Sequence, residues 1–244
     1  MLLAWGGDGT LQALVNGVYG SNVMIGILPA GGGNDFAAAL GLPSDPVFAA
    51  QMILKGKPRS VDLARARTAD GQTRLYAGGG GVGLDAEAAR LASGRYRRLP
   101  GRLRYIASAL QALAEHLPLK VRLEFPGEDL QPVETVSLLA GVLNTPTYGA
   151  GLRLAPDARI DDGLLNAVLL GDLSALNVLS LLPRLMGRGE LRTSRIKRWG
   201  VRSVRISTDR PCLFHGDGEI LGPAPVEIEV VPNAVRVLAP FREA

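Results

Sequence analysis

The hexapeptide Trp5-Gly6-Gly7-Asp8-Gly9-Thr10, almost at the N-terminus, decides the fold predicted for this chain. The apolar run of residues 1–5 indicates a short buried strand, and apolar residues recur at helical spacing from Leu11 onward. The glycines therefore lie where a strand turns into a helix. Without side chains they leave the backbone free and open to a ligand. The helix start offers unpaired N–H groups to a phosphate, and the Asp8 carboxylate could hold a magnesium ion on it.

A second glycine loop, residues 29–36, follows a second predicted strand, residues 23–28. Asn34 or Asp35 can cap a helix over residues 36–40, which Gly41 then ends. Two consecutive strand–glycine–helix units predict a parallel sheet with helices on its faces. Ligands of such sheets bind beyond the carboxyl ends of the strands, where both loops would lie. A tight turn without a ligand remains the alternative for the first loop, because its spacing matches neither the Walker P-loop nor the dinucleotide fingerprint.

From about Ser60 onward, many short apolar runs bounded by turn residues predict a β-rich sandwich or barrel. The predicted strands are residues 61–64, 73–77, 120–125, 135–143, 164–170, 203–207, 226–230 and 234–238. Helices are predicted over residues 103–116 and over residues 174–186, with Ser174 as the N-cap. The fold class is therefore α/β plus β. We predict a small α/β domain over residues 1–59, a larger β-sandwich-like domain over residues 60–244, and a site in the cleft between them.

The composition is that of a globular protein, with 47% hydrophobic residues and a net charge of +4. Cys212 is the one cysteine, which excludes an internal disulfide and fits a reducing, cytoplasmic compartment. No signal peptide is predicted, and the apolar residues 164–186 are too interrupted by polar residues to span a membrane. Arginines gather in two stretches, residues 90–104 and 184–205. Such clusters are either a solvated surface or a surface for anionic lipid headgroups, and nucleic acid is disfavoured because no aromatic platform accompanies them.

Three further stretches carry candidate chemistry. Gly78, Gly80 and Gly83 match G-x-G-x-x-G, but no acidic residue follows at the distance that a dinucleotide site needs, which disfavours a nucleotide role for this stretch. Asp161-Asp162-Gly163 is a turn with two carboxylates, which is either a plain hairpin turn or a site for a hard cation. His215-Gly216-Asp217-Gly218-Glu219 is, as bare sequence, a polar turn between strands.

These motifs together resemble the diacylglycerol kinase and sphingosine kinase family of lipid kinases. The first loop matches its GGDGT signature, and the second is similar to its PxGTxNDF element, with Gly32 at the position of the family's threonine. Gln12 and Ala13 stand where the family often carries Asn and Glu. The resemblance implies a Rossmann-like, NAD kinase-like first domain and a nucleotide site. The implied nucleotide-binding residues are Gly6, Gly7, Asp8, Gly9, Thr10, Gln12, Gly32, Asn34 and Asp35.

The resemblance extends to three later stretches. Residues 78–85 look like the family's entry to its second domain, which implies a glycine-rich turn and a helix that begins at Asp85. Residues 155–165 are similar to the family's APxAxxxDGLL element, which implies a structural magnesium held by the Asp162 side chain and the main-chain carbonyls of Arg159 and Leu164, with Asp161 assisting or substituting. The DGE element implies Glu219 as the general base, with His215 as a weaker competitor. Members of the family normally carry another βαβ stretch before GGDGT. The resemblance thus implies either truncation at the N-terminus or a protein that does without that stretch.

The implied function is an ATP- and Mg²⁺-dependent lipid kinase that transfers the γ-phosphate of ATP to a lipid hydroxyl. Diacylglycerol is the expected acceptor, giving phosphatidate in phospholipid biosynthesis, and a sphingoid base or phosphatidylglycerol stays open. We expect a cytoplasmic protein that meets the membrane surface during turnover, and a homodimer is left open. Two alternatives remain. One is a kinase of a soluble substrate such as NAD, and the other is a non-catalytic relative that binds nucleotide or membrane.

Overall fold

The N-terminal half forms around two parallel strands. The computed structural model describes residues 1–99, 101–115, 117–149, 151–171, 173, 177–178 and 195–240. β1 (Leu2–Gly6) and β2 (Met24–Pro29) pair in parallel, and α1 (Asp8–Val18) connects them. Of the predicted apolar positions of α1, Leu11, Val15 and Val18 are buried and Leu14 is half-buried. The first strand–glycine–helix unit is therefore confirmed, but the prediction that its strand is buried is wrong. Leu2, Leu3 and Trp5 of β1 retain 45%, 54% and 73% of their accessible surface, and Ala4 is buried.

Two short helices follow β2. α2 (Asp35–Ala39) starts at the second glycine loop as predicted. Sequence reasoning missed α3 (Pro46–Leu54), although its start signal is readable. Asp45 is its N-cap, accepting hydrogen bonds from the N–H groups of Val47 (2.8 Å) and Phe48 (3.1 Å), and Pro46 occupies the first turn.

The rest of the chain is β-rich, as predicted. Its strands are β3 (Lys57–Arg67), β4 (Thr73–Tyr76), β5 (Gly79–Gly83), β6 (Leu119–Glu124), β7 (Val133–Leu143), β8 (Leu165–Gly171), β9 (Ile196–Val201), β10 (Ser203–Thr208), β11 (Leu213–Gly216), β12 (Glu219–Pro223) and β13 (Val226–Ala239). The sheet path runs β1-β2-β13-β10-β6-β7-β5-β11-β12. β3 and β4 join it at β13, and β8 and β9 join it at β7.

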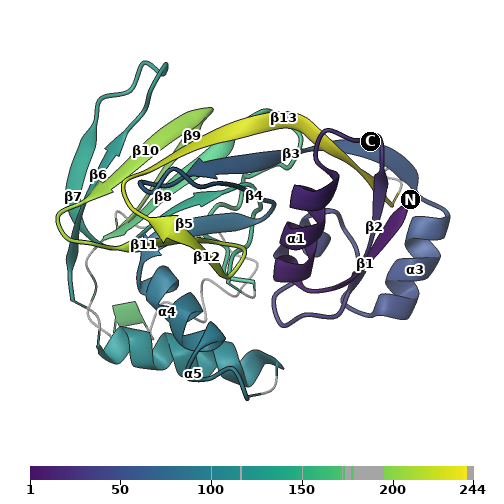
Figure 1. Cartoon of the computed structure of the whole chain (residues 1–244), viewed down its shortest axis with the longest axis horizontal. Helices are drawn as coiled ribbons and strands as arrows, with labels where there is room; N and C mark the ends of the chain where they lie inside the picture. The colour runs from purple at the N-terminus through teal and green to yellow at the C-terminus, as the bar shows by residue number, and fades with distance from the viewer. Residues whose placement is uncertain are drawn as a thin grey trace.

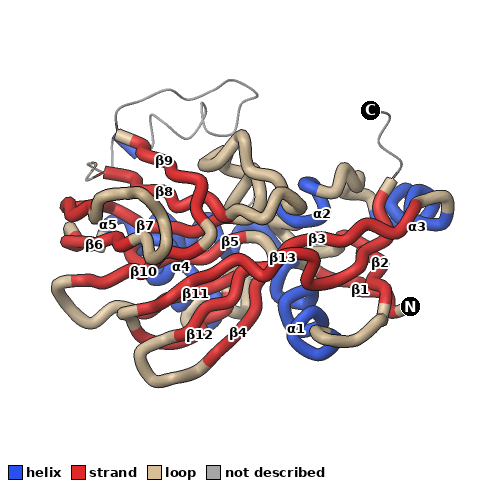
Figure 2. Tube along the Cα trace, turned by 90° about the horizontal axis from the view of Figure 1, so that it is seen from above, coloured by secondary structure: helices blue, strands red, loops and turns tan. Residues whose placement is uncertain are grey.

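One long strand connects the two halves. β13 runs from the β-rich half to the N-terminal half, beside β3 for most of its length (Figure 1; Figure 2). Near its end, Arg236 and Val237 pair in parallel with Met24 and Ile25 of β2. The two strands predicted at residues 226–230 and 234–238 are thus one strand, with a register shift between Val231 and Val235. The end of β13 packs in the N-terminal hydrophobic core, and the domain boundary between residues 59 and 60 stays a prediction.

The glycine stretch after β4 differs from its predicted structure. We predicted a turn, but Gly79–Gly83 is the buried strand β5, between β7 and β11. A Cβ on Gly80 would collide with the carbonyl of His215, and one on Gly81 would lie 2.8 Å from the carbonyl of Ala140. The glycines therefore allow two neighbouring strands to approach closely, which is a packing role.

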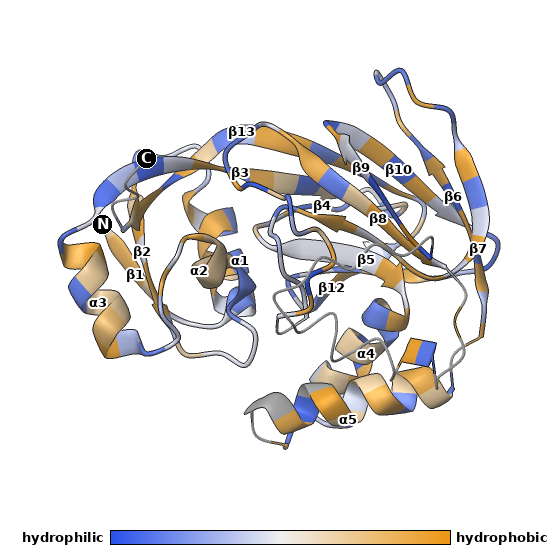
Figure 3. Ribbon diagram, turned by 180° about the vertical axis from the view of Figure 1, so that it is seen from behind, coloured by the Kyte–Doolittle hydropathy of each residue, from blue (hydrophilic) through white to orange (hydrophobic). Residues whose placement is uncertain are grey.

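Two helices cover one side of the β-rich half. α4 (Leu84–Ser93) begins one residue before Asp85, close to the predicted start, and α5 (Gly101–Ala114) covers most of the predicted helix over residues 103–116. α4 lies next to the strands and α5 lies outside it (Figure 3). β9, β11 and β12 were not predicted as strands, and the predicted helix over residues 174–186 lies, apart from Asn177 and Val178, outside the described residues.

Candidate active site

The two glycine loops contact each other at the ends of β1 and β2. A Cβ on Gly7 would lie 3.0 Å from the Cα of Gly31, so both positions need a residue without a side chain. The Asp8 carboxylate joins the loops. Its Oδ2 accepts a hydrogen bond from the N–H of Asn34 at 2.8 Å, and its Oδ1 accepts a longer one from the N–H of Phe36 at 3.4 Å. Asp8 therefore orders the second loop, in addition to any contact with a cation.

The polar side chains of the second loop are engaged by the protein itself. Asn34 adopts a left-handed conformation (φ 61°), and its side-chain amide bonds both the N–H (3.0 Å) and the carbonyl (2.8 Å) of Gly31. It occupies the N-cap position of α2 but makes no side-chain capping bond, so the expected cap is absent there. Asp35 is buried and accepts from the N–H of Gly151 at 3.1 Å, which connects this loop to the one after β7. Gly32 lies beside Gly31 in the same loop.

The first glycine loop faces the turn between β11 and β12. The side-chain amide of Gln12 is buried and donates to the carbonyl of Gly216 at 2.7 Å. Glu219 Oε1 stands 3.2 Å from the point that a Cβ on Gly9 would occupy. Thr10 is exposed, and Gly6 leaves room for its side chain. The structure thus brings the predicted base next to the predicted phosphate loop, although Gly9 and Glu219 are 210 positions apart in the sequence.

Sequence reasoning missed Asp217. This residue has φ 50°, and its carboxylate accepts hydrogen bonds from three consecutive N–H groups, those of Ala77 (2.7 Å), Gly78 (2.8 Å) and Gly79 (3.2 Å). It therefore fixes the β11–β12 turn to the chain entering β5. Burial, and second the nearby charge of Asp8, raise the pKa of Asp217 to about 7, although the three N–H bonds oppose the shift.

Several carboxylates approach one another at this point. Burial, and second the charge of Asp35, raise the pKa of Asp8, and bonds from the N–H groups of the second loop oppose that shift. Asp8 in turn raises the pKa of Asp217, and Glu219 lies against the neighbouring Gly9. Carboxylates that repel one another in this way favour a bound cation, because a cation removes the cost of ionising them together.

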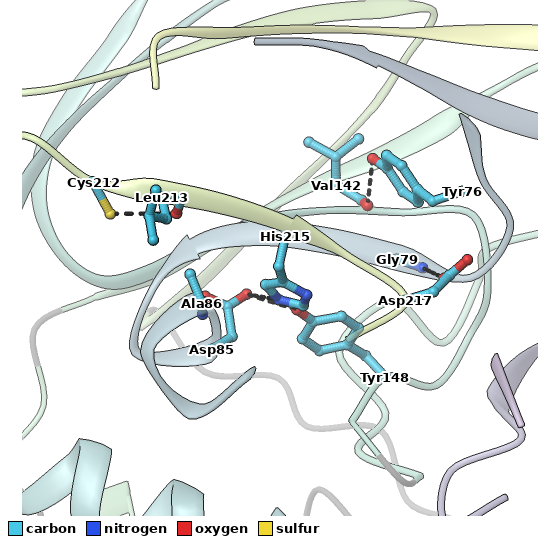
Figure 4. A network of polar contacts seen from close by, with 10 residues as sticks. All are labelled: Tyr76, Gly79, Asp85, Ala86, Val142, Tyr148, Cys212, Leu213, His215 and Asp217. Carbon is cyan, nitrogen blue, oxygen red and sulfur yellow. Dashed lines mark hydrogen bonds and ion pairs between the residues drawn. The ribbon is translucent and has the colours of Figure 1, made fainter. Parts of the chain in front are cut away.

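The His215 side chain points toward Tyr148 and Asp85 (Figure 4). It is buried, with Nε2 at 2.5 Å from Tyr148 Oη and 3.3 Å from Asp85 Oδ2. The Tyr148 hydroxyl donates to Asp85 Oδ2 at 2.7 Å, so the Nε2–H of His215 is the donor to Tyr148. Burial, with Asp85 next, raises the pKa of Tyr148 well above its usual value. This cluster fixes β11 to α4 and to the loop after β7, and gives His215 a structural position.

The predicted magnesium loop is ordered by two other carboxylates. Asp62 is buried and accepts from the N–H groups of Gly163 (2.7 Å) and Asn233 (2.8 Å). Asp161 is paired with Arg59 through hydrogen bonds of 2.6 and 3.0 Å, both to its Oδ2, so its assisting role stays a prediction. Asp162 is exposed, and its Oδ1 accepts from the N–H of Leu164 at 3.1 Å.

The donor set at this loop fits a hard cation only with help from water. One carboxylate and two carbonyls, those of Arg159 and Leu164, are oxygen ligands of the right kind but too few for magnesium's usual six. Within the described part of the chain, no three His, Cys, Asp or Glu side chains are grouped to hold a metal. The magnesium site therefore stays a prediction.

Two cavities stand out. A small one of about 10 Å³ lies between the glycine loops and is lined by residues that include Gly7, Asp8 and Asn34. The larger one, about 410 Å³, lies between α4, α5 and the start of β11, and charged Glu87, Glu115 and Arg210 line part of it. The larger cavity contains none of the predicted site residues.

Two family profiles match this chain and together cover most of it. A profile described as "Diacylglycerol kinase catalytic domain" matches residues 1–66, and one described as "YegS C-terminal NAD kinase beta sandwich-like domain" matches residues 80–239. The chain belongs to this family of diacylglycerol kinases and YegS-like lipid kinases.

The names of similar proteins agree with this family membership. The chain is 30% identical to a diacylglycerol kinase of Mycobacterium tuberculosis (98% of this chain, 76% of the relative) and 29% identical to a probable lipid kinase YegS-like protein of Stenotrophomonas maltophilia (98% and 79%). The crystal structure of a diacylglycerol kinase from Bacillus anthracis superposes with a TM-score of 0.71 at 20% identity, covering 98% of this chain and 76% of the other. Yeast NADH kinase shares the fold more distantly, at a TM-score of 0.50 and 12% identity (99% and 63%).

None of the described helices is both long and apolar enough to cross a membrane. The apolar stretch that begins at Leu164 forms strand β8 where the structure describes it.

Proposed function

We propose that this kinase transfers the γ-phosphate of ATP to a lipid hydroxyl, with diacylglycerol as the acceptor and phosphatidate as the product. The observation that carries the proposal is the position of Glu219 against Gly9 of the first glycine loop. A phosphate held at the loop would lie beside a carboxylate able to accept a proton. The names of the relatives support the lipid acceptor.

In this proposal Glu219 accepts the proton of the lipid hydroxyl while its oxygen attacks the γ-phosphate. Glu219 is exposed, so an acceptor can reach it. Residues Gly6, Gly7, Gly9 and Thr10 bind the phosphates through N–H groups at the start of α1. Bound magnesium, when present, neutralises phosphate charge, and Asp8 with Asp217 offers carboxylates that could hold it. Alignment and charge neutralisation then supply most of the rest of the rate enhancement.

A second magnesium role is structural. We propose that Asp162 and the carbonyls of Arg159 and Leu164 hold an ion that stabilises the loop before β8. Asp62 fixes the same loop from the protein side through Gly163. The ion would therefore rigidify a loop that is already anchored at one end.

The identity of the acceptor can be tested directly. Purified protein is incubated with Mg²⁺, labelled ATP and vesicles containing diacylglycerol, a sphingoid base or phosphatidylglycerol, with NAD in a parallel reaction. We expect label in phosphatidate. Label on NAD alone would favour a kinase of a soluble substrate, and ATP binding without any product would favour a non-catalytic relative.

A further inference from the structure

Helix α5 carries an exposed apolar face. Leu103, Ile106 and Leu110 retain 61%, 54% and 49% of their accessible surface. Their spacing of three and four residues places them on one side of the helix. Ser108 and Ala112, on the other side, are buried. We call these three exposed residues the α5 apolar face.

The position of α5 leaves this face exposed in the part of the chain that the structure describes. α5 packs on α4 and is the outer of these two helices (Figure 3). Two further leucines flank the helix in sequence, Leu99 with 39% and Leu117 with 66% of their surface exposed. Several large apolar side chains concentrated on one helix in this way mark an interaction surface, because single exposed residues are normal but contiguous ones are not.

The charges at the N-terminal end of the face are positive, whereas Glu115 follows the C-terminal end of α5. Arg95, Arg97 and Arg98 lie exposed in the connection between α4 and α5. None of these three guanidinium groups forms an ion pair with another residue in the described part of the chain. Residues 101–114 contain no acidic residue. The surface is therefore apolar with a basic end, which complements an anionic bilayer rather than a basic or neutral protein partner.

We propose that α5 docks this protein on anionic membranes, with Leu103, Ile106 and Leu110 in the interface and Arg95, Arg97 and Arg98 on lipid phosphates. The inference deepens the proposed lipid kinase function, on which its biological meaning rests. α4 packs against both α5 and the β11–β12 hairpin, which carries Glu219. Docking through α5 would thus bring the proposed catalytic base close to the membrane surface.

Vesicle co-sedimentation without ATP tests the docking surface separately from catalysis. The probes are phosphatidylcholine vesicles with and without phosphatidylglycerol. We expect binding that requires the anionic lipid, weakens with added salt and falls about tenfold or more in Ile106→Glu and in Arg97→Glu. Phe48→Glu on α3 (60% exposed before the change) and Arg74→Glu on β4 make matched changes away from α5, and we expect both to bind like the wild type.

Circular dichroism of each variant checks folding. We expect every variant to be folded, because the replaced side chains are exposed. Equal vesicle binding by Ile106→Glu and wild type would overturn the proposal, as would a wild type that ignores anionic vesicles. A wild-type dimer that Ile106→Glu converts to a monomer would assign the face to a second copy instead. Glu219→Gln should still bind vesicles, so loss of turnover with retained binding separates the two proposals.

Discussion

The Glu219 carboxylate packs against Gly9, with Oε1 3.2 Å from the point where a Cβ on Gly9 would stand. Gly9 is in the first turn of α1 and Glu219 is the first residue of β12. This contact joins the phosphate loop of the N-terminal half to the hairpin of the β-rich half. If Glu219 is the general base, this contact is what places it beside the phosphate held at the glycine loop.

Gly9→Ala should displace Glu219, because the added methyl group enters its contact distance. We expect turnover to fall about tenfold or more, since small misplacements of reacting groups are costly. Gly17→Ala in the same helix is the matched control, because nothing lies within 4 Å of its added Cβ. That control should keep full turnover and gain roughly 0.5–1 kcal/mol of stability. Equal turnover in both variants would argue against the Gly9–Glu219 contact.

Asp217 should make stability depend on pH. Its pKa is raised to about 7 in the folded protein, above the 3.8 of the free side chain. Between these values the folded state keeps a proton that the unfolded state has released, so this residue lowers the free energy of unfolding as pH rises towards 7. Urea unfolding of wild type and Asp217→Asn at about pH 4 and about pH 7 measures this effect. We expect the wild type to lose more stability than the variant over this range, and parallel losses would contradict the assignment.

The Asp85–Tyr148–His215 cluster should matter for stability. Tyr148→Phe removes the hydroxyl that donates to Asp85 and accepts from His215, leaving two buried polar groups poorly satisfied. We expect a loss of roughly 1–3 kcal/mol in urea unfolding. Tyr19→Phe removes an exposed hydroxyl bonded to Arg65 and should cost less than about 0.5 kcal/mol. Similar small losses for both would show that the buried cluster contributes little.

The proposed magnesium loop can be tested by thermal unfolding. Mg²⁺ should raise the Tm of the wild type, because a ligand that binds only the folded state stabilises it. Asp162→Asn should remove most of that increase, while Asp129→Asn, which lies outside the loop, should preserve it. A Tm increase that survives in Asp162→Asn would place the ion elsewhere.

Local signals in the sequence predicted much of the fold. Residues 1–18 gave a correct strand, turn and helix because apolar spacing and glycines agree there. β5 was misread because a run of glycines shows no apolar alternation, and only its neighbours, such as the carbonyl of His215, explain the missing side chains. α3 was overlooked, although Asp45 as N-cap and Pro46 in the first turn are recognisable start signals for a helix.

The site was harder to predict. The position of Glu219 beside Gly9 follows from sheet pairing over the whole chain, which no local pattern encodes. Asp217 looked like an ordinary turn residue, because its three partners are backbone N–H groups at residues 77–79. The ion pair of Asp161 with Arg59 likewise joins residues that are far apart in sequence.

The most direct test of the central claim is the turnover of Glu219→Gln on diacylglycerol vesicles, measured together with its affinity for ATP. A positioned general base contributes about 10²–10⁴-fold, so kcat should fall by about that factor while the Kd for ATP changes little. Full activity in Glu219→Gln would remove this carboxylate from the mechanism.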